Sequence, residues 1–513
     1  MRRVENKLRQ QRREDRRAVS GGGGQLAWRK FRNPLPPLAL LSEAELDLID
    51  DVALRVLEEL GLEFQNRESL DILERHGAGV DRATGMVRFE RGLIRELVAK
   101  SPARFPLYSR NPERTLDIGG DAVNFAPVGG PPNVSDLDRG RRPGTFEAQC
   151  ELIRLHQSLN CLHLAGSTPV EAIDLPVESR HLDLYWAQLV YSDRAWNARG
   201  IGRRRVEDAV EIMALARGKP REALLSEPSL LCVINVNSPR RVDNELLAGL
   251  MAMAEAGQML VITPFTLAGA MSPVTIAGSL AQQTAEALGV IAFAQMVRPG
   301  TPVVFGGFTS NVDMKSGAPA FGTPEYVRGV IIGGQVARRW KLPYRSSSVT
   351  SSNTVDTQAA TESMMSLWAA IMSHANVIMH STGWLEGGLV ASFEKSIIDA
   401  DMISAMTAWL QPLDMSAAAL GFEAIAATPP GGHFFGAAHT LERFQTAFHQ
   451  SMTADLRPFQ TWAEDGAKTA TQRANHIWKS LLANYELPPM DPAVREELSG
   501  FMARRKQEIV AGH

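Results

Sequence analysis

The sequence contains few of the residues that mark disulfide scaffolds, zinc ribbons or nucleic-acid-binding proteins. Its 513 residues include three scattered cysteines, Cys150, Cys161 and Cys232, and no CxxC pair. This pattern excludes a disulfide scaffold and fits a reducing cytosol, so we expect a cytoplasmic protein. The formal net charge of −3 argues against a nucleic-acid partner. No apolar stretch reaches the roughly 20 residues that a membrane helix needs, so we expect no membrane partner.

The N-terminus is basic and leads into a glycine run, "MRRVENKLRQQRREDRRAVSGGGGQ". Its twin arginines are not followed by an apolar segment, so we do not interpret them as an export signal. A charge run of this kind is usually solvated, and we expect a flexible basic arm over residues 1–30. An arm that touches RNA or clasps another subunit is the less favoured interpretation.

Hydrophobic periodicity divides the rest of the chain into three parts. A helix that begins at a Ser cap in "SEAELDLIDDVALRVLEELGLEF" opens an α-rich N-terminal cap over residues 31–120. Apolar runs, each followed by turn residues and a helical stretch, occupy residues 121–425. From residue 426 to 513 the period is helical, which predicts a C-terminal helical subdomain.

The middle part predicts a (β/α)8 barrel, also called a TIM barrel, and hence an α/β fold. Its eight apolar runs are roughly 30–45 residues apart, about the length of one βαβ unit. A doubly wound sheet is the alternative, but such sheets rarely need eight parallel strands. The runs begin near Val123, Leu162, Arg194, Leu230, Met259, Thr301, Leu342 and Asn376.

The active site of such a barrel lies at the carboxyl ends of its strands. No lysine lies there, so a Schiff-base enzyme is not expected. The chain has no HExxH and no His/Asp pair at metal-ligand spacing, so we expect no metal site. Cys232 lies inside a strand. "PVGGPP", after the first strand, is too rich in proline to open a dinucleotide-binding helix.

Aromatic rings, amides, hydroxyls and one carboxylate follow the predicted strands. Rings beside a carboxylate suit a quaternary ammonium, which ring faces attract by about 0.5–2 kcal/mol each. Asparagines, a histidine and hydroxyls suit a carboxylate, so a zwitterion such as a betaine would use both groups. The alternative is that the rings only close the end of the barrel as core. The residues at the strand exits include Asn197, Asn235, Asn237, Thr263, Phe265, Phe305, Phe308, Tyr344, Arg345, His380, Trp384 and Glu386.

Long ordered blocks of the sequence resemble the trimethylamine methyltransferase family, whose members demethylate methylated amines for a corrinoid protein. The resemblance covers nearly the whole chain from about residue 31. Its blocks are "NVNSPRRVD", "LAGAMSPVTIAGSLAQQTAEAL", "QMVRPGTPVVFGG", "HSTGWLEGGLVASFEKSIIDADM" and "PGGHFFGAAHTLERF".

The resemblance implies a (β/α)8 barrel that transfers a methyl group to cob(I)alamin. The cobalamin would be carried by a separate corrinoid protein that docks on the barrel mouth, and this chain, which lacks a DxHxxG motif, would hold no cofactor tightly. Archaeal trimethylamine enzymes carry pyrrolysine near the exit of the seventh strand, at a position within Ser351–Asp356 here, where all residues are standard. The chain therefore resembles the non-pyrrolysine branch, some members of which act on glycine betaine.

The absence of pyrrolysine favours a substrate with a permanent positive charge, because a quaternary amine leaves as a neutral amine without needing a proton. Glu386 and His380 are the candidate catalytic residues, with Glu386 and Trp384 at the ammonium end. We expect Phe305, Phe308 and Tyr344 to be cage walls, and Asn235, Asn237 and His380 to orient a carboxylate tail. Arg345 either pairs with Glu386 or anchors that carboxylate, and His433 lines the mouth where the corrinoid protein docks.

Three other interpretations remain open. The substrate could be trimethylamine or another tertiary methylamine. The chain could be a quaternary-amine binding protein without catalysis. A phosphate-substrate isomerase could use the glycines after the eighth strand. Large apolar barrels commonly self-associate, so we expect a homo-oligomer.

Overall fold

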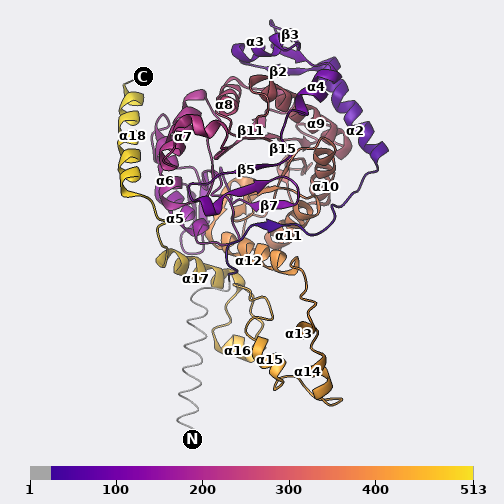
Figure 1. Cartoon of the computed structure of the whole chain (residues 1–513), viewed down its shortest axis with the longest axis vertical. Coiled ribbons are helices and arrows are strands. Elements are labelled where there is room, and N and C mark those ends of the chain that lie inside the picture. Colours follow the sequence, from indigo (N-terminus) through magenta and orange to yellow (C-terminus); the bar gives the residue numbers. More distant parts are fainter. Residues whose placement is uncertain (1–24, 512–513) are drawn as a thin grey trace.

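The computed structural model describes residues 25–511 and shows a mixed α/β fold built on a curled eight-stranded sheet (Figure 1). The strand order is β1-β7-β19-β18-β15-β13-β11-β10. Neighbouring strands from β7 to β10 are parallel, and β1 is antiparallel to β7. The strands are β1 Phe31–Arg32, β7 Ala122–Phe125, β10 Trp196–Asn197, β11 Leu230–Val236, β13 Met259–Pro264, β15 Val303–Gly306, β18 Tyr344–Ser347 and β19 Val377–Met379.

Seven of the eight predicted apolar runs contain one of these parallel strands, and the run that begins at Leu162 does not. Its backbone nevertheless bonds on both sides: the Leu164 N–H donates to the Phe125 carbonyl at 3.2 Å, and the Ala165 N–H donates to the Ala195 carbonyl at 2.9 Å. The residues that follow form an isolated bridge from Gly166 to Trp196. This segment therefore lies between β7 and β10, the two ends of the parallel part of the sheet.

A helix follows each of the seven parallel strands and the bridging segment, and the helices surround the sheet in Figure 1. These helices are α5 Phe146–Gln157, α6 Arg180–Tyr191, α7 Arg203–Ala216, α8 Asn244–Glu255, α9 Ile276–Val297, α10 Pro324–Arg339, α11 Thr357–Met372 and α12 Phe393–Trp409. Strand followed by helix is therefore the repeating unit, as the sequence predicts.

Side chains alternate between the two faces of the sheet. Leu231, Met259, Val261, Val304 and Val377 pack in one apolar cluster inside the curl. Their chain neighbours point to the opposite face, toward the helices. The hairpin of β5 Phe105–Leu107 and β6 Leu116–Ile118 adds its apolar side chains to the inner cluster and closes the curl on one side.

The N-terminal region, residues 31–120, packs against α9 and holds six short strands, β1 to β6, beside three α-helices. The predicted helix that begins at Ser42 is confirmed as α2 Glu43–Arg55, with a capping box formed by Ser42 and Glu45, and it continues in a π-helical turn, Val56–Leu60. The remaining elements of the region are β2 Leu62–Phe64, α3 Arg67–Arg75, β3 Gly79–Asp81, β4 Met86–Arg88, α4 Arg91–Val98 and the 3-10 turn Pro112–Arg114. Residues 1–24 of the predicted basic arm lie outside the described residues.

Small sheets surround the carboxyl ends of the parallel strands, which we call the mouth. One contains β8 Asn133–Asp136, β9 Gly140–Pro143, β20 Trp384–Leu385 and β21 Val390–Ser392. Another contains β14 Leu267–Ala268, β16 Ser310–Val312 and β17 Pro319–Ala320, and β12 Arg241–Val242 pairs with β2. All but β2 belong to loops that leave the parallel strands at this end.

The chain beyond α12 leaves the body of the protein and returns to it. Residues 411–468, here called the appendage, extend away from the body in Figure 1 and carry α13 Ala417–Leu420, α14 Phe422–Ala427, α15 Ala438–Arg443 and α16 Phe459–Glu464. Asp401 of α12 fixes its middle, because its carboxylate accepts from the backbone of Met452 (2.9 Å) and Thr453 (3.0 Å). Helices α17 Ala470–Ala483 and α18 Pro492–Val510 then pack on α12 and α7.

Within residues 25–511, no helix is long and apolar enough to cross a membrane.

A buried ion pair holds the loop that carries the most promising site residues. The Lys395 ammonium contacts the Asp399 carboxylate and donates to Ser363 Oγ at 2.8 Å, and Asp399 accepts the Gly383 N–H at 2.9 Å. Lys395→Met would leave the Asp399 carboxylate buried without its cation. We expect the free energy of unfolding to fall by about 3–5 kcal/mol, measured by urea denaturation. Lys100→Met, which removes an exposed pair with Glu96, should cost under about 1 kcal/mol. Equal losses in the two variants would contradict this reading.

Candidate functional site

The mouth brings polar and aromatic side chains from neighbouring strands onto the inner face of the sheet. Because Leu231 and Met259 face inward, alternation also places Asn235 and Thr263 inward, and these two are register partners on β11 and β13. Asn235 is exposed, whereas Thr263 is buried and its hydroxyl has no hydrogen-bond partner within residues 25–511. The inner face is therefore apolar at depth and polar at the mouth.

An aromatic cluster stands beside these polar groups. The ring centroids of His380 and Trp384 are 4.3 Å apart, and Phe308 lies 6.0 Å from His380 and 6.5 Å from Trp384. Phe265 and Phe321 extend the cluster at 5.2 Å and 5.4 Å from Phe308. Loops that follow four different segments of the sheet and mouth thus converge on Phe308.

Arg345 is a buried cation that no carboxylate neutralises within residues 25–511. It is 2% exposed, its guanidinium carbon lies 4.9 Å from the centre of the Phe308 ring, and it donates to the Gly307 carbonyl at 3.4 Å. Its Nε–H has no partner, and no carboxylate in the described part of the chain lies within ion-pair distance. Burial lowers the pKa of Arg345 to about 10, so the group stays charged at neutral pH and the site carries a net positive charge.

His380 directly follows β19 and lies in the left-handed region, with φ of 55°. A residue with a side chain rarely adopts this conformation, which costs on the order of 1–3 kcal/mol. The turn interrupts the alternation of β19 and brings the ring to Ser347, where Nδ1 lies 3.1 Å from Oγ. Burial and the neighbouring Arg345 guanidinium hold the pKa of His380 well below its usual range, so the imidazole is neutral.

Glu386 is neutralised by an arginine, but not by Arg345. Arg141 of β9 donates from Nε to both carboxylate oxygens, at 3.0 and 3.1 Å. The expected pairing of Arg345 with Glu386 is therefore wrong. Glu386 also has a positive φ of 51°, and its N–H donates to the carbonyl of Ser352. The segment Ser351–Asp356 thus contacts the loop of the eighth strand at the mouth.

The glycines after Glu386 do not form an anion cradle. The Gly387 N–H already donates to the Thr350 carbonyl at 3.2 Å, and the Leu389 N–H donates to the Glu386 carbonyl at 3.3 Å. Two of the N–H groups that such a cradle would need are therefore already bonded to carbonyls, which argues against the phosphate-isomerase alternative.

Three predicted binding residues are not brought into this cluster. Phe305 and Tyr344 face the helices, because Val304 and Arg345 occupy the inward positions of β15 and β18. The Tyr344 hydroxyl donates to the Val330 carbonyl of α10 at 3.0 Å. Asn237 lies beyond the end of β11, where its side-chain oxygen accepts the Asp243 N–H at 3.3 Å. The structure does not support a cage role for Phe305 and Tyr344, and it gives Asn237 a local turn contact.

His433 is not at the mouth. It lies in the appendage between α14 and α15, exposed, with its ring 5.6 Å from that of Phe435. The appendage begins where α12 ends, and α12 starts at the mouth and runs about 25 Å in the opposite direction. The structure therefore contradicts the expectation that His433 lines the mouth where a corrinoid protein docks.

Two aromatic residues of the cluster were not among the predicted binding residues. Phe265 follows β13 by one residue and was named among the strand exits but given no binding role, although alternation places it on the inward face with Thr263. Phe321 comes from a loop just before α10, well past its strand, and no strand-end rule would have selected it.

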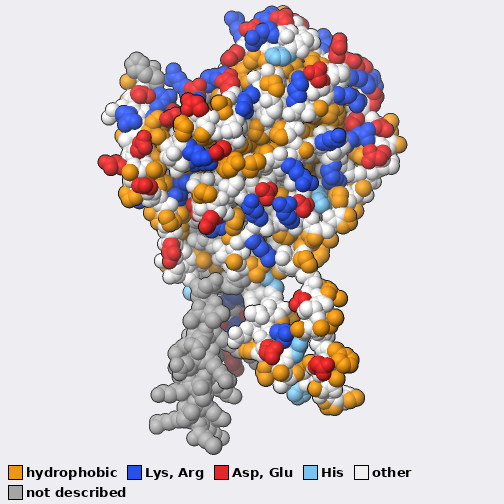
Figure 2. Space-filling view, in the orientation of Figure 1, with side chains coloured by type: hydrophobic (Ala, Val, Ile, Leu, Met, Phe, Trp, Pro, Cys, Tyr) orange, Lys and Arg blue, Asp and Glu red, His pale blue; other side chains and the backbone are white. Residues whose placement is uncertain are grey.

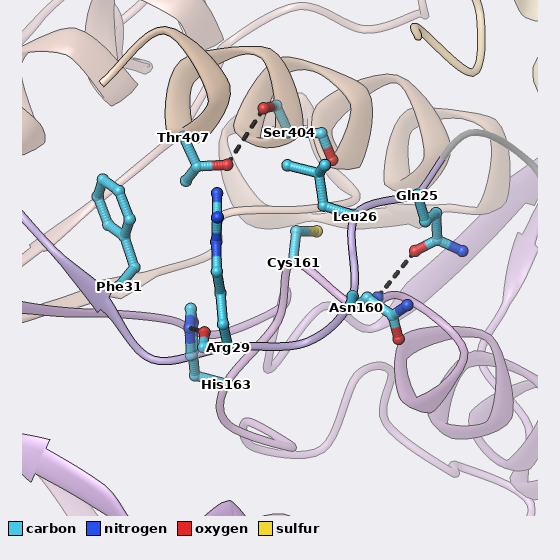
Figure 3. Close-up of a pocket in the computed structure, with 10 residues that line it drawn as sticks. Gln25, Leu26, Arg29, Phe31, Asn160, Cys161, His163, Ser404 and Thr407 are labelled. Atoms are coloured by element: carbon cyan, nitrogen blue, oxygen red, sulfur yellow. Dashed lines mark hydrogen bonds between the residues drawn. The ribbon is translucent and has the colours of Figure 1, made fainter. Parts of the chain in front are cut away.

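A small pocket at the opposite end of the sheet is unrelated to this cluster (Figure 3). It lies between the segment that precedes β1 and the last turns of α12, and its lining includes Gln25, Asn160, Cys161, Ser404 and Thr407. Burial raises the pKa of the Cys161 thiol to about 12, so this thiol is not a nucleophile at neutral pH. Among residues 25–511, no group of three or more His, Cys, Asp or Glu side chains is arranged to hold a metal ion.

Comparison with known proteins agrees with the resemblance seen in the sequence. The family model described as "Trimethylamine methyltransferase (MTTB)" matches residues 8–510. A glycine betaine methyltransferase of Desulfitobacterium hafniense (strain Y51) is 34% identical over 93% of this chain and 98% of its own length.

Two further relatives are more distant. The trimethylamine methyltransferase MttB of Desulfitobacterium hafniense (strain DSM 10664 / DCB-2) is 26% identical over 92% of this chain and 95% of its own length. A proline betaine:corrinoid methyltransferase of Eubacterium limosum is 24% identical over 90% of this chain and 96% of its own length. The family resemblance is confirmed over nearly the whole chain.

The neutral state of His380 predicts a pH dependence of stability. As pH falls below about 6.5, an unfolded histidine gains a proton that the native one cannot, so each such histidine lowers the free energy of unfolding by about 1.4 kcal/mol per pH unit. His380→Gln should reduce this slope between pH 6 and 5, measured by urea denaturation. His163, whose pKa burial lowers to about 4, gives a positive control as His163→Gln. A slope unchanged in His380→Gln alone would show that His380 protonates freely in the native state.

Proposed function

Because the chain belongs to the trimethylamine methyltransferase family, we propose that it is a methyltransferase that moves a methyl group from a betaine to cob(I)alamin on a separate corrinoid protein. A betaine here means a quaternary ammonium that carries a carboxylate. The observation that carries the choice of substrate is Arg345, a buried cation that has no carboxylate partner in the described part of the chain and lies over the Phe308 ring at the mouth.

Arg345 favours a zwitterion over a simple cation. A substrate carboxylate would supply the missing negative charge and accept from the unpartnered Nε–H, in the geometry that guanidinium groups favour. A bare cation such as choline would instead meet Arg345 unscreened. At about 5 Å and an effective dielectric constant of about 20, this repulsion is roughly 3 kcal/mol.

The ring cluster suits the ammonium end of the same molecule. A betaine carries its ammonium close to its carboxylate, and Arg345 lies against Phe308, so a carboxylate on Arg345 brings the methyl groups to the rings of Phe308, Trp384 and His380. Neutral His380 adds no repulsion. We propose that the faces of these rings bind the cation, and that Asn235 and Thr263 form a polar wall opposite them.

The reaction needs little acid–base chemistry from the protein. The methyl carbon forms a bond to cobalt with the electron pair of Co(I), and the C–N electron pair remains on nitrogen, which leaves as a neutral tertiary amine. The protein orients one methyl group toward the mouth and excludes water. Because positive charge leaves nitrogen in the transition state, ring contacts that hold the cation too tightly would slow the transfer.

Glu386 has a different role in this proposal from the one expected from the sequence. Arg141 already neutralises its carboxylate, so Glu386 gains little from a substrate ammonium. We propose that Glu386 and Arg141 fix the Trp384–Leu389 loop at the rim of the mouth, and that Trp384 contacts the substrate. His380 orients the substrate and does not act as an acid or base.

The fold and the partners follow from the same proposal. We propose that the bridging segment 163–166 closes the sheet into a (β/α)8 barrel, since its backbone bonds to both β7 and the residues before β10. The corrinoid protein docks on the mouth and presents the cobalamin, so this chain needs no tightly bound cofactor. All three cysteines are free, which supports a location in the cytoplasm.

Trimethylamine is the second candidate substrate, supported by the family name and the relative from strain DCB-2. We test both with purified protein, cob(I)alamin and a panel of glycine betaine, proline betaine, carnitine, choline and trimethylamine. Formation of methylcobalamin, followed by its absorption spectrum, should occur with the betaines and be at least tenfold slower with choline and trimethylamine. Binding of betaine without any methyl transfer, even with a corrinoid protein present, would favour the non-catalytic alternative.

The role of Arg345 can be separated from general damage to the site. Arg345→Met should lower kcat/KM for glycine betaine by about 100-fold, equivalent to about 3 kcal/mol, because the carboxylate loses its charged partner. Activity toward choline should fall less, or rise, since the repulsion is gone.

Arg141→Met is the matched control for loss of an arginine at the mouth. We expect it to reduce activity toward glycine betaine and choline by the same factor, because Arg141 acts through the loop. Equal losses on the two substrates in Arg345→Met would mean that Arg345 only supports the fold.

A further inference from the structure

We propose that the appendage, residues 411–468, is a clasp that packs against a second copy of this chain. This inference is independent of the substrate and concerns the end of the protein opposite the mouth.

The appendage has no hydrophobic core of its own. None of its helices, α13 to α16, contains a buried residue. Every phenylalanine that is exposed within residues 25–511 lies in it, and Figure 2 shows hydrophobic side chains on its visible surface. These exposed residues are Leu413, Met415, Leu420, Phe422, Ile425, Phe434, Phe435, Leu441, Phe444, Phe448, Leu456 and Phe459.

Short helices without a core need burial against something else. Ordering each residue costs on the order of 1–2 kcal/mol of conformational entropy, and the internal contacts of the appendage bury little. Its exposed phenylalanines, at 44% to 82% exposure, could bury roughly 800 Å² at about 200 Å² for a whole aromatic side chain. That area is close to what each partner contributes to a stable protein–protein interface, about 800 Å².

The scarcity of charge in the outer part of the appendage indicates a permanent partner. Between residues 411 and 450 the charged side chains are Asp414, Glu423, Glu442 and Arg443, whereas residues 451–468, where the chain returns to the body, add Asp455, Arg457, Glu464, Asp465 and Lys468. Interfaces that remain assembled are apolar and poor in charge, whereas proteins that dock and leave use smaller, more polar surfaces. A corrinoid carrier must dock and leave, and it must reach the mouth, at the other end of α12.

The body of the protein offers an apolar surface beside the appendage that a second copy would share. At the ends of α11 and α12 away from the mouth, Trp368 and Trp409 stack with ring centroids 5.2 Å apart, and Trp409 is 50% exposed. Met365, also on α11, is 42% exposed. In a twofold dimer each copy presents the same surfaces, so the appendage of one copy packs on the α11–α12 surface of the other.

The mass of the full chain in solution tests the clasp. Sedimentation velocity at micromolar concentration should give a dimer or an even multiple of it for the wild type. The double variant Phe435→Glu/Phe448→Glu should give a monomer with an unchanged far-UV circular dichroism spectrum. Leu48→Glu, which places the same charge on an exposed leucine of α2, should leave the mass unchanged. A monomeric wild type, or a double variant of unchanged mass, would overturn the proposal.

The identity of the occupant needs a second measurement. A photo-crosslinking amino acid at position 435, in a mixture of nitrogen-14 and nitrogen-15 chains, should give cross-links between labelled and unlabelled chains that map to α11 or α12. Cross-links confined to single chains would show that the appendage folds back on its own body. Cross-links that form only when a corrinoid protein is added would assign the surface to that protein instead.

Discussion

The arrangement of the mouth depends on a buried guanidinium that the protein does not neutralise. Removing a cation from water is costly, and proteins usually offset this cost with a carboxylate and further hydrogen bonds. Within residues 25–511, Arg345 has no carboxylate partner and one hydrogen bond, to the Gly307 carbonyl, and the Glu386 carboxylate is held by Arg141. What remains is the face of Phe308 and one carbonyl. In the proposed function, a substrate carboxylate supplies the ion pair that Arg345 lacks in the unliganded protein, and this is the proposed basis of a preference for betaines.

The surrounding structure keeps that charge in place. Parallel strands direct alternate side chains inward, so Arg345 on β18 faces the curl while Tyr344 anchors the strand to α10. Backbone conformations that cost free energy at His380 and Glu386 turn the eighth loop over the mouth. The buried pair of Lys395 and Asp399 holds Gly383 just before Trp384. The buried pair of Lys395 and Asp399 thus helps to maintain the strained backbone conformations of the loop at the mouth.

Much of this could be predicted from the sequence, and the parts that failed share a physical cause. Seven of the eight strands predicted from the strand–helix repeat are present, with the helices after them, because apolar runs and turn residues are local signals. The ends of the strands indicated Trp384, Phe308, His380 and Arg345. Which side chains of a two-residue or four-residue strand face inward depends on the register of that strand with its neighbours. The residue pattern around Phe305 and Tyr344 did not reveal this register, so both were wrongly expected to face inward.

Contacts between segments that are distant in the chain could not be predicted from the sequence. Arg141 lies far from Glu386 in the chain, and Phe321 arrives from a loop. His433 belongs to an excursion whose direction is set by where α12 ends. The sequence blocks shared with the family contain such residues but do not indicate where they lie in the structure. The resemblance therefore predicted the chemistry better than the positions of the site residues.

Ligand-induced thermal stabilisation, measured without cobalamin, tests the role of Arg345 as a carboxylate receptor most directly. A ligand that binds the native state raises the melting temperature, by an amount that grows with the logarithm of its concentration relative to Kd. The account predicts that glycine betaine raises the melting temperature while choline at the same concentration has little effect, and that Arg345→Met abolishes the difference. Equal stabilisation of the wild type by betaine and choline would contradict it.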